Sequence, residues 1–168
     1  MPHASRIIPL RGAPTVEAGH TARLEQWIAH VRQIRKGFHL TKVEFDEILR
    51  WKLGDLFSRQ EKLRASNTND AIRFTTRAAF AIESGDFDYE LEVRVGLLTA
   101  LPGVGVPVAA AVLAICEPRR YAVLDSTSWE QLFGKPKRSF TINDYKKFMQ
   151  LVHRLAANAY ADRVAKAG

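Results

Sequence analysis

A glycine-rich turn is the segment of this chain whose residue types and spacing could bind a ligand. It lies between two stretches of helical apolar spacing and reads Leu101-Pro102-Gly103-Val104-Gly105. Proline and glycine end one helix, and two glycines allow a tight turn with positive φ. The N–H groups of Val104, Gly105 and Val106 would then start the next helix, where unpaired N–H groups and the helix dipole favour phosphate. We predict a phosphate-binding turn, with an ordinary helix–helix turn as the alternative.

Basic side chains follow in the loop Gly134-Lys135-Pro136-Lys137-Arg138. The net charge of the chain is +7, and the excess is at its two ends: residues 1–40 hold six basic and two acidic side chains, and residues 101–168 hold ten and five. Such an excess can fold into one basic face that suits a polyanion such as DNA. We predict phosphate contacts from Lys135, Lys137 and Arg138, with solvated surface charge as the alternative.

Helices must position both segments, because apolar residues recur at three- and four-residue steps along most of the chain. Glycines, prolines and polar turns divide this pattern into about seven helices, with breaks at Gly37, Gly54, 84–86, Pro102, Pro118 and Gly134. The run 108–116 is almost wholly apolar, which is typical of a helix buried on most sides. Nothing resembles a strand pair or an internal repeat. We predict an all-α fold, a compact multi-helix domain.

Capping residues support these helix starts. Thr41 with Glu44 predicts a capping box, and Thr141 with Asp144 predicts a similar start for the last helix. No helix is predicted in the polar stretch 58–69.

The third helix has an apolar stripe that includes Phe74, and Asn67 or Asn69 is its expected cap. Residues 1–20 contain three prolines and two glycines without apolar periodicity, so we predict a flexible tail there. A single domain is expected over residues 21–168.

Composition excludes several classes of protein. Hydrophobic residues make up 46% and charged residues 26%, which is typical of a soluble globular protein and not of a disordered one. No apolar run approaches the roughly 20 residues of a membrane span. The first residues lack the charged start, apolar stretch and small-residue cleavage site of a secretory signal, so we expect none. The one cysteine, Cys116, excludes an intramolecular disulfide and a four-cysteine cluster. We expect a cytoplasmic protein, nucleoid-associated if it binds DNA, with no metal or organic cofactor.

The turn 101–105 and the Ala-rich helix after it resemble the helix-hairpin-helix motif of DNA-binding proteins. The likeness extends to the helix-hairpin-helix base-excision DNA glycosylases, such as endonuclease III, whose catalytic aspartate lies about two dozen residues beyond the hairpin's leucine. Here Leu101 and Asp125 are 24 positions apart, and the run 121–124 resembles the family's apolar approach to that aspartate. This specific match covers roughly residues 93–132. The segment 40–80 also resembles a bacterial group with this fold and no assigned function.

Three departures from the family pattern limit what the resemblance implies. Lyase-active members have a Schiff-base lysine where this chain has Pro107. Ser126-Thr127-Ser128 replaces the common Thr-His after the aspartate, and the four-cysteine iron–sulfur cluster is impossible. The resemblance therefore implies a small monofunctional glycosylase without β-lyase activity, or a relative that kept the fold and lost the reaction.

The resemblance implies a catalytic role for Asp125, whose carboxylate would stabilise positive charge on the sugar or orient water. The alternative is a helix N-cap worth about 1 kcal/mol. Trp129 and Trp51 are candidates for the base pocket, and Lys52 for a phosphate contact there. The alternative for the tryptophans is a partly buried core position.

We expect binding of double-stranded DNA through the hairpin and a basic face, with removal of a damaged or modified base as the further activity. Two alternatives stay open: a non-catalytic helix-hairpin-helix DNA-binding module, and a protein-interaction domain that kept the fold. The sequence indicates neither the base nor a protein partner.

Overall fold

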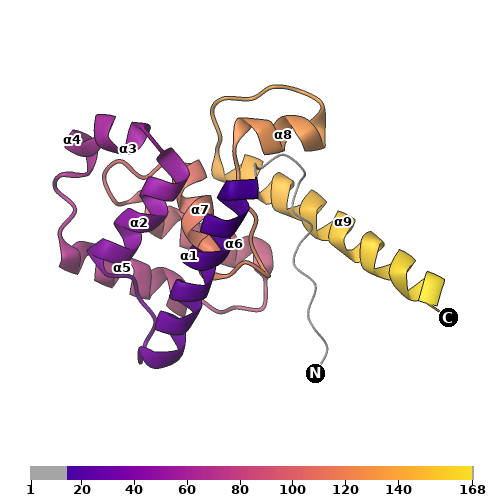
Figure 1. Cartoon of the computed structure of the whole chain (residues 1–168), viewed down its shortest axis with the longest axis horizontal. Coiled ribbons are helices and arrows are strands. Elements are labelled where there is room, and N and C mark those ends of the chain that lie inside the picture. The colour runs from indigo at the N-terminus through magenta and orange to yellow at the C-terminus, as the bar shows by residue number, and fades with distance from the viewer. Residues whose placement is uncertain (1–14, 168) are drawn as a thin grey trace.

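The computed structural model describes residues 15–167, and within this range the chain is helical and without strands, which confirms the all-α prediction (Figure 1). The nine helices of the described residues are α1 (Thr15–Ile34), α2 (Lys42–Leu53), α3 (Leu56–Arg59), α4 (Glu61–Arg64), α5 (Asn69–Ala81), α6 (Phe87–Thr99), α7 (Val106–Cys116), α8 (Ser126–Phe133) and α9 (Ile142–Ala167). Seven of them are the predicted helices.

Helix α1 begins six residues before the predicted start, so the tail prediction is wrong for residues 15–20. Gly19 costs a helix about 1 kcal/mol. Burial of Leu24, Ile28 and Val31 further along α1 stabilises the whole helix and offsets this cost. The rest of the predicted tail lies outside the described residues.

The stretch 58–69 contains helix that its polar composition did not predict, because α3 and α4 fold back onto the domain. Arg64 is buried, and its guanidinium lies 4.3 Å from the ring centroid of Phe57 and donates to the Phe57 carbonyl. The cap of α5 is Thr68 and not Asn67 or Asn69, since the Thr68 hydroxyl accepts the Ala71 N–H at 3.1 Å. Two single-turn helices therefore join the seven predicted ones.

Helix α7 is the centre of the core. Its residues from Val108 to Cys116 are all buried, as predicted for both the helix and the cysteine. Helices α1, α2, α6 and α9 pack around it, and each contributes fully buried side chains such as Ile28, Leu49, Leu98 and Phe148. This packing fixes both ends of α7, and the glycine-rich turn and the approach to Asp125 lie just beyond those ends.

Two features lie outside this packing. Phe74 belongs to the predicted stripe of α5 but is 67% exposed, because it lies about 200° around the helix from Ile72. The C-terminal half of α9 extends away from the body of the molecule (Figure 1). No helix in residues 15–167 has both the length and the apolar character needed to span a membrane.

Candidate nucleic-acid interface

The turn between α6 and α7 has a backbone that requires glycine. Gly103 has φ of +77°, and a Cβ there would lie 2.7 Å from Cγ of Arg64 and 3.2 Å from Cβ of Leu63. The turn is thus pressed against α4. The Val104 N–H donates to the Leu101 carbonyl at 3.1 Å and Val104 is buried, so this N–H closes the turn and is not presented to a ligand, contrary to the prediction.

The N-terminus of α7 keeps two of the predicted donors. Gly105 is the N-cap, extended and exposed, and no side chain caps the helix. Within residues 15–167 the N–H groups of Gly105 and Val106 have no hydrogen-bond acceptor. Pro107 has no N–H to offer in this first turn. An uncapped helix start with unpaired donors provides partial positive charge that favours an anion.

A buried amide that the sequence did not indicate as a site residue holds this turn. Asn67 is 5% exposed, and its side-chain Nδ2 donates to the Pro102 carbonyl at 2.9 Å. Its own N–H donates to the Arg64 carbonyl at 2.9 Å. The turn is therefore fixed from α4 and from the residue that precedes the cap of α5.

Asp125 is the N-cap of α8. Its Oδ1 accepts the Ser128 N–H at 2.7 Å, and the Ser128 hydroxyl accepts the Asp125 N–H at 3.0 Å, which completes a capping box. The predicted N-cap role of Asp125 is therefore confirmed. It uses only one carboxylate oxygen, because Oδ2 lies 3.7 Å from Nζ of Lys52 and the side chain is 47% exposed.

Lys52, at the end of α2, reaches across to this carboxylate. Its side chain is 12% exposed, and Nζ donates to the Leu124 carbonyl at 3.2 Å. Burial lowers the pKa of Lys52, and the negative charge of Asp125 offsets part of this effect. The ammonium group is thus directed to Leu124 and Asp125.

The two tryptophans are packed into the protein. Trp129 is 8% exposed and stacks on Phe133, with 4.1 Å between ring centroids. Trp51 is half-buried against the core, and its Nε1 donates to the Thr21 hydroxyl at 2.9 Å. The structure therefore brings Lys52 to Asp125, and it gives both tryptophans structural contacts.

The basic side chains of the loop between α8 and α9 differ in whether they form an ion pair. Lys137 pairs with Asp144 at 3.2 Å and lies 5.4 Å from the Trp129 ring centroid, so it ties the loop to α9. Lys135 and Arg138 are exposed and form no ion pair within the described part of the chain. These two side chains are the ones in the loop that can reach an external phosphate.

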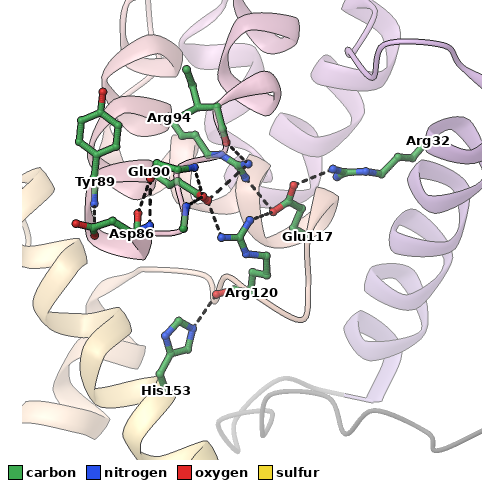
Figure 2. Close-up of polar contacts among 11 residues, drawn as sticks. Arg32, Asp86, Tyr89, Glu90, Arg94, Glu117, Arg120 and His153 are labelled. Atoms are coloured by element: carbon green, nitrogen blue, oxygen red, sulfur yellow. Dashed lines mark hydrogen bonds and ion pairs between the residues drawn. The ribbon is translucent and has the colours of Figure 1, made fainter.

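A buried network of Arg and Glu fixes the other end of α7 (Figure 2). Glu117, which ends α7, binds Arg94 and Arg32 at 2.9 Å each and Arg120 at 3.4 Å. Glu90 binds Arg120 at 2.6 Å and accepts the Ser84 N–H at 2.8 Å. The network therefore joins α1, α6 and the end of α7.

At Glu90, hydrogen bonds and the Arg120 charge together outweigh the effect of burial on the pKa. Burial alone would raise the pKa of Glu90, but the N–H groups of Ser84 and Gly85 and the Arg120 guanidinium outweigh it and lower the pKa to about 2. Arg94 is 1% exposed and also donates to the Ile82 carbonyl at 2.7 Å. The sequence analysis missed this network, although Glu90 and Arg94 have the spacing of a helical ion pair.

Comparison with protein-family models, with curated proteins and with solved structures found no match to this chain. The family resemblance of the sequence therefore stays a prediction.

Proposed function

We propose that this protein binds duplex DNA and cleaves the N-glycosidic bond of a damaged or modified nucleotide, with Asp125 as the catalytic carboxylate. The observation that carries the proposal is the state of that carboxylate. One oxygen is fixed by the Ser128 N–H, and the other lies 3.7 Å from the ammonium of Lys52 in a side chain that is 47% exposed. A purely capping aspartate needs no such cation.

In the proposed reaction the target nucleotide leaves the base stack. As the glycosidic bond breaks, the base departs with the bonding electron pair and positive charge develops on the sugar. The ionised Asp125 stabilises this charge and orients a water molecule whose oxygen bonds to C1′. The water loses one proton to solvent, the departing base nitrogen takes up one proton from solvent, and the products are the free base and an abasic site.

The DNA contacts come from two surfaces. The N–H groups of Gly105 and Val106 bind one phosphate at the start of α7, and Lys135 and Arg138 bind others from the loop. Helix α4, which packs against the hairpin, lies with α8 along one edge of the molecule (upper edge in Figure 1). This arrangement supports a single DNA-binding face.

The test is single-turnover cleavage of end-labelled duplexes that carry a panel of damaged bases, at low salt, with and without alkali. Asp125→Asn keeps a good N-cap and removes the charge, so we expect loss of cleavage with unchanged DNA affinity. Asp86→Asn is the matched control. Asp86 caps α6 by accepting the Tyr89 N–H at 3.1 Å, and we expect full activity from this variant.

Each of the other outcomes would support a different function for this protein. Salt-sensitive binding without cleavage of any substrate would favour the non-catalytic DNA-binding module. Arg138→Gln should weaken the binding and reduce its salt dependence, whereas Arg73→Gln, at an exposed ion pair on α5, should not. No binding by the wild-type protein would reject the DNA function and favour the protein-interaction domain.

A further inference from the structure

We propose that Lys52 is the positioning residue of this site: its ammonium group holds the free oxygen of Asp125 in place and keeps it paired with a positive charge. This inference rests on the proposed function and extends it to a residue of a different helix.

The geometry that supports it is a bridge between two helices. Among the described residues, α2 and α8 do not pack against each other. Lys52 nevertheless reaches from the end of α2 to Asp125 Oδ2, 3.7 Å from Nζ, and to the Leu124 carbonyl at 3.2 Å. Two anchors on adjacent residues fix the ammonium group relative to the N-cap of α8.

Burial makes this arrangement more than a surface ion pair. The Lys52 side chain is 12% exposed. Asp125 is the charged group whose field acts on it in the described part of the chain. Lys137, in the loop after α8, is paired with Asp144 instead. The cation at Asp125 is therefore supplied by Lys52.

The protonation of Lys52 gives the test its readout. Because burial lowers the pKa of Lys52, it loses its proton below the ordinary lysine value of about 10.4. The positive charge beside Asp125 then disappears as the pH rises. The cleavage rate should fall along this alkaline limb, because the carboxylate oxygen loses its partner.

The experiment compares three variants with the wild type in single-turnover rate and DNA affinity from pH 6 to pH 10. Lys52→Met keeps the stem and removes the charge, and we expect a rate about 10- to 100-fold lower at neutral pH, with affinity within about threefold. Lys52→Arg keeps the charge, so it should recover most of the rate and lack the alkaline limb. Lys42→Met breaks the exposed Lys42–Asp46 pair of the same helix and should change neither.

A second measurement does not depend on catalysis. In the wild type, the carboxyl ¹³C resonance of Asp125 should show a step at alkaline pH as Lys52 loses its proton. This step should be absent in Lys52→Met and Lys52→Arg. If the wild type cleaves nothing but the step is present, the proposed function fails and the positioning geometry stands. If the step is absent, or if Lys52→Met lowers only stability, the inference is overturned.

Discussion

The protein has two sets of ion pairs that differ in how completely their charges are compensated. In the network at the end of α7, Glu90 and Arg94 are buried, the Glu117 side chain is 9% exposed, and each carboxylate has several donors. At the start of α8, Asp125 is 47% exposed and its second oxygen has one cation at 3.7 Å. The first arrangement satisfies charge that cannot reach water. The second leaves a carboxylate oxygen available to a new partner.

The difference indicates how to distinguish a structural charge from a functional one in this molecule. Buried charges must be paired, and removing one partner leaves another charge uncompensated. An exposed carboxylate has no such constraint, so its fixed geometry needs another explanation.

The largest effect is expected from Arg94→Met. It removes the buried partner of Glu117 and leaves both Glu117 and Glu90 short of a cation, so we expect a loss of about 3–5 kcal/mol in unfolding free energy. Urea denaturation followed by circular dichroism measures it. Arg73→Met, which breaks the exposed Arg73–Asp70 pair, should cost less than about 1 kcal/mol. Equal losses in the two variants would remove the contrast.

The pH dependence of stability should report the same network. The pKa of Glu90 is about 2 in the folded protein, below its ordinary value of about 4.3. A lowered pKa gives stability that is fully present above the ordinary value and is lost as the pH falls toward 2. We therefore expect Glu90→Gln to be less stable than wild type at pH 6 and to lose less on acidification. Parallel curves for the two proteins between pH 5 and pH 2 would contradict this assignment.

A smaller effect is expected at the hairpin. Gly103 and Gly85 have nearly the same φ, +77° and +78°, but only Gly103 has side-chain atoms where a Cβ would lie. Gly103→Ala should therefore cost about 1–3 kcal/mol more than Gly85→Ala, because it adds a clash with Arg64 to the same backbone strain. It should also weaken DNA binding, since the turn must shift. Equal unfolding free energies would show that α4 moves aside freely.

The smallest effect on stability is expected at Asp125. Asparagine caps helices as well as aspartate does, so Asp125→Asn should change the unfolding free energy by less than about 0.5 kcal/mol, while Asp125→Ala should cost about 1 kcal/mol. A thermal melt measures both. A large loss in Asp125→Asn would mean that the Lys52 pair is structural, which would place Asp125 with the network.

Local patterns predicted much of the fold. The seven longer helices follow from apolar spacing, and the capping boxes at Thr41 and Thr141 are present because both partners lie within one turn. The single-turn helices α3 and α4 were not predicted. They are stabilised by the burial of Arg64 and not by their own composition. Helix α1 begins earlier in the chain than predicted for a similar reason, because burial of its later residues stabilises the whole helix.

The site was predicted only where its parts are local. The cap at Asp125 and the turn at Gly103 could be recognised from neighbouring residues. The contact of Lys52 with Asp125, and that of Arg32 with Glu117, join residues distant in sequence and required the tertiary fold. The hydrogen bond from the Val104 N–H to the Leu101 carbonyl could not be predicted, because the glycines allow this turn geometry but do not require it.

The burial of Val108–Cys116 in α7 also determines how slowly their amide hydrogens exchange with water. Amide hydrogens of Val108–Cys116 should exchange with deuterated water only when the whole molecule unfolds, whereas those near the projecting end of α9 should exchange by fraying. The exchange rate of these α7 amide hydrogens therefore reports global unfolding. Any compound that binds only the folded state slows this exchange by a factor of 1 + L/Kd, where L is the free concentration of the compound. Ligands can thus be found by their effect on α7 before the reaction is known.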